Sequence, residues 1–397
     1  MSAKNISRFH LSRQIALFSI ILFLVEFVRG AALISFIPIY GEKGLLLPLG
    51  IIGVAITAHY ITDTALKMFI GYLLDRFSIK FVVHTGLLIS FAGLFLIHYA
   101  SYPWIFVAAA ALYGVGISPI WIVCLTQVSE KNRATQMGLL YTIWLVGLGA
   151  GPVVSNFIMD ISYNLTFWIL VGLSFLSWIL ALLITNEKTS SIRKISMRRQ
   201  FQILGGRLRQ MKLLLPGMVL QTLGASMLVP ILPGFAESEL GMSNTQYSYL
   251  LLAGGGCTVL GLIPLGKLSD KLGKKWFLVI GFLIFGFGLY SISTGKPGIA
   301  EAILWAVVLG ISYAAVLPAW NALLAAYVPP SQKGLGWGIF STVEGVGVMI
   351  GPALGGLLAQ WYGTSTTVVL SAILFAVIAL FYMFFPFRVF RGELRKG

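Results

Sequence analysis

The chain has 397 residues, of which 58% are hydrophobic and only 10% are charged, and its formal net charge is +15. A soluble domain carries roughly 25% charged residues, so this composition excludes a soluble globular protein. Long apolar runs separated by short polar loops indicate membrane-spanning helices, because a helical span needs about 20 mainly apolar residues, whereas the strands of a membrane barrel are only about 10 residues long and alternate in polarity.

Twelve apolar runs follow one another along the chain. In the first half they cover 15–39, 49–73, 80–100, 104–126, 137–156 and 165–185. In the second half they cover 213–235, 245–266, 276–294, 300–327, 335–360 and 367–386. The first run is too long for the apolar core of a cleavable signal peptide, and it contains two charged residues. We therefore expect an all-α protein that crosses the membrane twelve times.

The basic residues gather in every second loop. The loops between these basic loops contain only two basic residues, Lys43 and Lys296. Since basic loops stay on the cytoplasmic side, we expect a protein of the bacterial plasma membrane with both termini in the cytoplasm. This placement accounts for the positive charge without nucleic acid, because basic loops face anionic lipid head groups.

Motifs of the first half recur in the second half, about 200 residues later. The matching pairs are Gly71-x-x-x-Asp75-Arg76 with Gly266-x-x-x-Asp270-Lys271, Ser118-Pro119-Ile-Trp121 with Leu317-Pro318-Ala-Trp320, and the glycine-rich segments that end in Gly151-Pro152 and Gly351-Pro352. The basic segment 186–212 contains no run long enough to span the membrane. We expect two pseudo-symmetric six-helix bundles, 1–185 and 213–397, joined by a cytoplasmic linker at 186–212.

The first of these motif pairs resembles the loop signature of the major facilitator superfamily. Its first copy departs from the signature, with Ser78 and Ile79 where Gly and Arg are usual. The resemblance implies two bundles that rock about a site at the middle of the membrane. It also implies that a cytoplasmic gate is formed by Gly71, Asp75, Arg76, Gly266, Asp270 and Lys271. The plainer alternative is that the two aspartates only anchor loops near helix ends.

Ionisable residues within the spans are unevenly distributed. The second half has one clear example, Glu344, while the first two spans contain Glu26, Arg29, His59, Asp63 and Lys67. A charge at the membrane centre costs about 2.5–3.5 kcal/mol, so these residues are candidates for function. Helical spacing lets Glu26 pair with Arg29 and places the three later residues on one helix face. We expect the charges of the two spans to face each other or a shared cavity.

Two interpretations of this cluster stay open. It is either an inert charge network between two helices or a proton site in a polar substrate pocket. Within the second interpretation, Asp63 is the better candidate for the titrating group, because Glu26 is expected to be clamped by Arg29. His59 could simply hydrogen-bond a carboxylate.

Aromatic and amide side chains extend the two candidate pockets. Trp121 and Trp144 lie deep in the fourth and fifth spans, where they either pack in the core or hold a sugar ring. A polar pocket in one bundle and an apolar pocket in the other suits an amphiphile with lipid tails. For the head group we expect Glu26, Arg29, Asp63, Lys67, Trp121 and Trp144; for proton coupling Asp63, Glu26, Arg29 and His59; and for the tails Trp320, Asn321, Gln221 and Glu344.

Several longer strings sharpen the resemblance, among them Glu26-Phe-Val-Arg29-Gly30, His59-Tyr-Ile-Thr-Asp63, Trp144-Leu-Val-Gly147 and Leu317-Pro-Ala-Trp320-Asn321. They resemble the proton-coupled flippases for the glycolipid anchor of lipoteichoic acid. This resemblance implies an antiporter that moves a diglycosyl-diacylglycerol from the inner to the outer leaflet, with the head group in the first bundle and Trp320 in an apolar cavity of the second. Lys67 and Glu344 depart from that family, in which uncharged amides are usual.

A multidrug/proton antiporter is the alternative, because it would share the Gly-Pro segments and the midspan acids. A non-transporting receptor or scaffold is a further alternative, against which the gate motifs in both halves argue. An enzyme is not expected, and neither is a cofactor or a metal, because Cys124 and Cys257 lie in apolar runs and no catalytic motif occurs. The expected partners are the glycolipid, protons and membrane lipids, with the protein a monomer.

Overall fold

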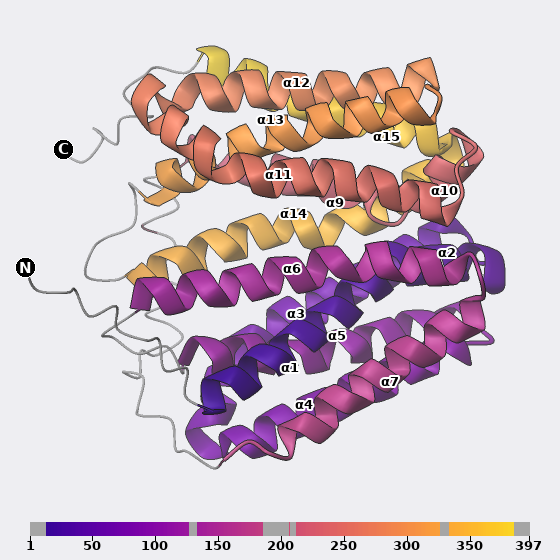
Figure 1. Ribbon diagram of the computed structural model, residues 1–397, viewed down its shortest axis with the longest axis vertical. Helices are drawn as coiled ribbons and strands as arrows, with labels where there is room; N and C mark the ends of the chain where they lie inside the picture. The colour runs from indigo at the N-terminus through magenta and orange to yellow at the C-terminus, as the bar shows by residue number, and fades with distance from the viewer. Residues whose placement is uncertain (1–12, 127–132, 186–205, 207–211, 326–332, 385–397) are drawn as a thin grey trace, which may run out of the picture.

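A computed structural model describes residues 13–126, 133–185, 206, 212–325 and 333–384. All regular structure in these ranges is helical (Figure 1). Eleven helices are long and apolar enough to cross a membrane, or twelve if one bent pair counts as a single span. The expected all-α, multi-pass membrane fold is therefore confirmed. Apart from Gly206 and Lys212, the predicted linker 186–212 lies outside the described residues.

The first bundle contains α1 (Arg13–Gly30), α3 (Leu49–Arg76), α4 (Ile79–His98), α5 (Pro103–Thr126), α6 (Arg133–Met159) and α7 (Tyr163–Ala181). Beyond α1 the first span continues through the π-helix η1 (Ala31–Phe36), the single turn α2 (Ile37–Ile39) and the π-helix η2 (Tyr40–Gly44). Pro38 lacks the N–H that an α-helix would donate to the carbonyl of Ile34, so the regular hydrogen-bond pattern of an α-helix is interrupted at this point. The helical register thus changes two residues after Arg29, and the first span ends at Gly44 rather than at residue 39.

The second bundle contains α9 (Leu215–Leu228), α10 (Leu232–Ser238), α11 (Asn244–Leu272), α12 (Lys274–Gly295), α13 (Ile299–Ala325), α14 (Lys333–Tyr362) and α15 (Thr364–Phe384). The run expected at 213–235 is not one straight helix, because α9 and α10 meet at an angle of 49°. Pro230 lies between them, and a proline inside a helix removes a hydrogen bond and bends the axis.

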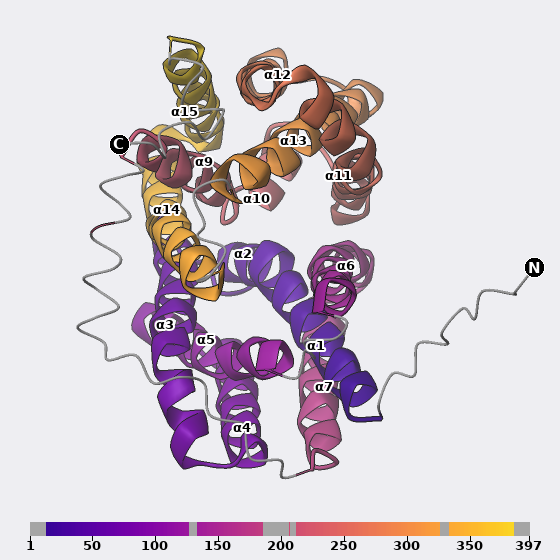
Figure 2. The same ribbon diagram turned by 90° about the vertical axis from the view of Figure 1, so that its left-hand side faces the viewer.

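Each bundle buries an apolar core of its own. Figure 2 shows α1 to α7 on one side of the molecule and α9 to α15 on the other, with α6 beside α11 and α3 beside α14 at the boundary. The packing of α1 on α6 recurs as that of α9 on α14. An added Cβ at Gly151 would lie 2.7 Å from the backbone N of Ala31, and one at Gly351 would lie 2.9 Å from the carbonyl O of Leu223. Glycine at both positions lets the helices approach closely.

The helix ends define two faces of the molecule. The terminal face is the one where α1 begins at Arg13 and α15 ends at Phe384, and the distal face is the opposite one. Hydrogen bonds join the bundles in the half nearer the distal face: Gly50 N to Gln360 Oε1 (3.1 Å), Ala353 N to Thr57 Oγ1 (2.9 Å) and Ser248 Oγ to Val153 O (3.1 Å). The structure therefore has the two bundles held together toward the distal face.

Candidate functional site

Arg29 joins the first two spans through two carboxylates. Its Nη1 atom lies 3.5 Å from Oε2 of Glu26, one turn earlier on α1, and its Nη2 atom lies 3.3 Å from Oδ2 of Asp63 on α3. The side chains of Glu26 and Asp63 are only 1% and 2% exposed. One guanidinium thus pairs with two buried carboxylates. Its planar set of N–H donors is better suited to binding two carboxylates than a lysine ammonium group is.

Aromatic rings lie beside this ion cluster. The Cζ atom of Arg29 lies 5.9 Å from the ring centre of Tyr60, within the range of a cation–π contact. His59 is fully buried, and its ring centre lies 5.0 Å from that of Tyr113. His59 and Asp63 are one helical turn apart on α3. Lys67 follows one turn later, but its side chain lies outside the described residues.

The tryptophans of α5 and α6 come together near the same depth. Gly147 on α6 packs against α1, where an added Cβ would lie 3.2 Å from Cβ of Glu26. Trp144 precedes Gly147 by three residues, or about 4.5 Å along the helix axis. Its ring centre lies 6.2 Å from that of Trp121 on α5. The first bundle therefore places two indole rings on helices that adjoin the ion cluster.

The second bundle contains a polar cluster around Glu344 on α14. Nε1 of Trp320 donates to Oε1 of Glu344 at 2.9 Å, and Nε2 of Gln221 donates to the same oxygen at 3.3 Å. Trp320 is 1% exposed, so its ring packs in the core of this bundle while its N–H holds the carboxylate. Asn321 is exposed, and the hydrogen bonds described for this cluster do not include it. The structure thus brings together three of the four residues expected at the tail pocket.

The predicted gate residues are described in the second bundle only. Gly266 faces Pro318, whose Cβ would lie 3.2 Å from an added Cβ. The side chain of Asp270 is 68% exposed, and its described ionic contact is Lys274 of the same bundle, at 4.0 Å. Lys271 is exposed. The side chains of Gly71, Asp75 and Arg76, at the end of α3, lie outside the described residues, so the gate remains a prediction.

At the distal face, Asp160 caps the first turn of α11 across the bundle boundary. Its carboxylate accepts hydrogen bonds from Thr245 N at 2.7 Å, from Asn244 N at 3.2 Å and from Asn244 Nδ2 at 2.8 Å. Partial burial raises the pKa of Asp160, but these hydrogen bonds outweigh it and hold the pKa below its usual value. Lys43 and Glu237 form a second ionic contact between the bundles.

Sequence reasoning missed these distal contacts. Asp160, Lys43 and Glu237 lie in or beside short loops, where no periodic pattern indicates a partner. The one local signal is the capping box of Ser243 and Gln246. It predicts where α11 begins, but not that a carboxylate of the other bundle lies against that end.

The chain is similar to known membrane transporters over nearly its whole length. The sequence profile of the Major Facilitator Superfamily matches residues 18–213 and 214–396. Proteins named proton-coupled antiporter flippase LtaA from Staphylococcus saprophyticus, Staphylococcus epidermidis and Staphylococcus aureus are each 32% identical to it, over 96%, 97% and 96% of this chain and 96%, 98% and 97% of theirs.

Two solved structures share the fold. The nucleoside transporter NupG superposes with a TM-score of 0.77 at 15% identity, covering 94% of this chain and 98% of that one. A bacterial homologue of the human lysosomal transporter Spinster, in an inward-facing and unoccupied conformation, superposes with a TM-score of 0.76 at 15% identity, covering 96% and 97%. At such low identity these likenesses concern the fold alone.

Proposed function

Since this chain belongs to the Major Facilitator Superfamily and, within it, to the proton-coupled antiporter flippases, we propose that it moves a diglycosyl-diacylglycerol, the anchor of lipoteichoic acid, from the inner to the outer leaflet. The observation that carries this proposal is the pair of buried acids, Glu26 and Asp63, that share Arg29 in the first bundle. Buried charge of this kind in a membrane helix is costly and is typical of proton and substrate sites.

The head group lies in the first bundle in this proposal. The rings of Trp121 and Trp144, 6.2 Å apart, offer apolar faces for sugar rings, while Glu26, Arg29 and Asp63 supply hydrogen-bonding partners. Lys67, one turn beyond Asp63, extends the same set. The tails lie against the second bundle, where the polar side chains of Gln221, Trp320 and Glu344 are engaged with one another. Asn321 follows Trp320 in the chain.

Protons move through Asp63 in this proposal. When Asp63 takes up a proton, Arg29 keeps its ion pair with Glu26. The contact between Arg29 on α1 and Asp63 on α3 then weakens, but the guanidinium still has a carboxylate partner. His59, buried one turn from Asp63, orients that carboxyl group in this proposal. Opening to one side loads the proton, and opening to the other releases it.

We infer the orientation from the basic loops: in this proposal the terminal face lies in the cytoplasm of a bacterial cell. The contacts at the distal face then close the outer side, and the gate motifs, including Gly71, Asp75, Arg76 and Asp270, control the cytoplasmic side. In this proposal the described conformation accepts lipid from the inner leaflet.

A translocation assay tests the proposal. The full chain in proteoliposomes, given fluorescent diglucosyl-diacylglycerol, should transfer the lipid between leaflets faster than empty vesicles and faster still with a pH gradient. A matched set of vesicles receives lipophilic cations instead. Transport of the cations without movement of the glycolipid would replace our proposal with multidrug antiport.

A further inference from the structure

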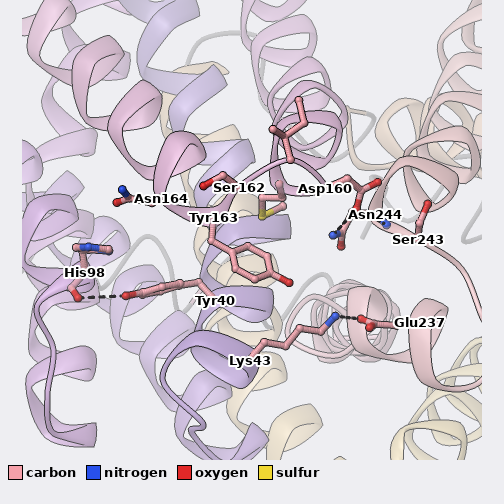
Figure 3. A pocket seen from close by; sticks show the side chains of 12 residues that line it. Tyr40, Lys43, His98, Asp160, Ser162, Tyr163, Asn164, Glu237, Ser243 and Asn244 are labelled. Atoms are coloured by element: carbon pink, nitrogen blue, oxygen red, sulfur yellow. Dashed lines mark hydrogen bonds and ion pairs between the residues drawn. The ribbon is translucent and has the colours of Figure 1, made fainter.

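A pocket of about 780 Å³ lies at the distal face, between the two bundles. Figure 3 shows Tyr40, Tyr163 and Asn164 of the first bundle opposite Glu237, Ser243 and Asn244 of the second. The volume falls within the range of about 300–1,000 Å³ that is common for small-molecule sites. Lys43 at its edge follows Arg29 by 14 residues, or about 20 Å of helix, so the pocket is separate from the central ion cluster.

The charged groups of this pocket are engaged with protein partners. Lys43 pairs with Glu237, and the carboxylate of Asp160 accepts three hydrogen bonds from the start of α11. The two acids and one lysine leave a formal charge of −1, which disfavours phosphate and other anions. Each carboxylate still has lone pairs that can accept hydrogen bonds from hydroxyl groups.

Aromatic rings form the other part of the lining. Tyr40 is fixed by its hydroxyl, which donates to the carbonyl O of His98 at 3.2 Å, and by stacking on the His98 ring at 5.5 Å. The ring of Tyr163 extends into the pocket in Figure 3. Flat apolar rings surrounded by amides, hydroxyls and carboxylates match the chemistry of a sugar, which has apolar ring faces and a rim of hydroxyl groups.

We propose that this pocket binds a neutral carbohydrate, a hexose or a disaccharide, either as a free sugar or as the head group of a lipid. Because the lining comes from both bundles, the ligand bridges them and binds best while the distal face is closed. A ligand that prefers one conformation shifts the population toward it, so an occupied pocket slows opening at this face. The inference does not depend on which substrate crosses at the central site.

Binding to the purified full-length chain in nanodiscs tests the proposal, with cellobiose as the free neutral sugar, glucose 6-phosphate as an anionic sugar and diglucosyl-diacylglycerol as the lipid form. We expect cellobiose to bind more tightly than glucose 6-phosphate. Tyr163→Ala should weaken cellobiose binding about fivefold to tenfold, as the loss of one aromatic contact does. Tyr102→Ala is the matched control, because Tyr102 is an exposed tyrosine (60%) at the same face that does not line the pocket.

A second pair of variants fixes the location. Asn164→Ala, an exposed position in the pocket rim, replaces Tyr163→Ala if the latter does not fold, and Trp144→Ala reports on the central site. Weaker binding of both cellobiose and the glycolipid in the pocket variants indicates a general sugar site, and an effect on the glycolipid alone indicates a lipid head-group site. The proposal is overturned if the pocket variants leave both affinities unchanged, or if Trp144→Ala alone abolishes binding. A chain that binds sugar here but flips no lipid would contradict the proposed function and not this inference.

Discussion

The Nη2 atom of Arg29 lies 3.3 Å from Oδ2 of Asp63, although the two residues are 34 positions apart and belong to different helices. The other arm of the guanidinium lies 3.5 Å from Glu26. One cation therefore ties α1 to α3 in the first bundle and compensates two buried acids.

Replacing Arg29 should destabilise the fold more than replacing either acid. In Arg29→Gln, two buried carboxylates lose their shared cation, and breaking a buried pair in this way costs about 3–5 kcal/mol. In Asp63→Asn, Arg29 keeps Glu26 and the cost is smaller. Thermal unfolding of the detergent-solubilised variants measures the difference. Equal losses of stability in the two variants would contradict the shared role of Arg29.

The glycines of α6 differ in what surrounds them. Gly151→Ala should destabilise by about 1–3 kcal/mol, because its Cβ would meet the backbone of α1. Gly149→Ala is the matched control, since its Cβ meets nothing within 4 Å and alanine favours a helix by up to about 1 kcal/mol. Unfolding curves of the two variants should thus move in opposite directions, and destabilisation of both by the same amount would refute the close approach as its cause.

The carboxylate of Glu344 is held by neutral donors, so an amide should replace it well. Glu344→Gln keeps an oxygen for Trp320 Nε1 and Gln221 Nε2 and removes the cost of a buried charge, so stability should be unchanged or higher by about 1 kcal/mol. Trp320→Phe leaves Glu344 without its 2.9 Å donor and should cost about 1–3 kcal/mol. A loss of several kcal/mol in Glu344→Gln would show that the charge itself is needed.

Closure at the distal face should depend on the charge of Asp160. Its pKa is lowered in the closed form by the N–H groups of α11, so the ionised carboxylate favours closure. This contribution is complete above the usual pKa of about 3.9 and is lost as the pH falls through the lowered value. The contribution of Asp160 to closure should therefore be constant from about pH 5 to pH 8 and should decrease below about pH 4.

Spin labels at positions 102 and 362 can report this closure through the distance between them. Tyr102 and Tyr362 are 60% and 65% exposed. The labelled chain carries Cys124→Ala and Cys257→Ala, which remove its own two cysteines. Asp160→Asn should open the distal face at neutral pH. It should also abolish the part of the opening at low pH that comes from protonation of Asp160. The other charged groups in the pocket, Lys43 and Glu237, are retained in both chains, so the comparison isolates Asp160. A distance distribution identical in both chains at every pH would contradict the assigned contact.

Sequence reasoning reached the fold and the members of the central cluster because their signals are local. Apolar run length identifies a span, and spacing along one helix brings Glu26 next to Arg29. Because a charge within a span is costly, the sequence also predicts a functional role for Asp63. In the structure Asp63 lies against Arg29. The π-helices after Arg29 were not foreseen, because a proline predicts a disturbance of the helix but not its form.

Contacts between the bundles could not be foreseen in this way. Asp160 and Asn244 are 84 positions apart, and their contact depends on how two separately packed bundles lie together. The role expected for Trp320 also shows the limit. An indole in an apolar span is equally compatible with lining a pocket and with packing in the core. The hydrogen bond from Trp320 to Glu344 is seen only in the structure, where α13 lies near α14.

Gradient-driven flipping by Asp63→Asn shows whether Asp63 couples lipid transport to protons. Proteoliposomes with fluorescent diglucosyl-diacylglycerol are compared with and without a pH gradient, for the wild-type chain and for the variant. The gradient should accelerate flipping by the wild-type chain and not by Asp63→Asn, which keeps the size of the side chain but cannot take up the proton. Flipping by Asp63→Asn as fast as by the wild type under the gradient would contradict this role of Asp63.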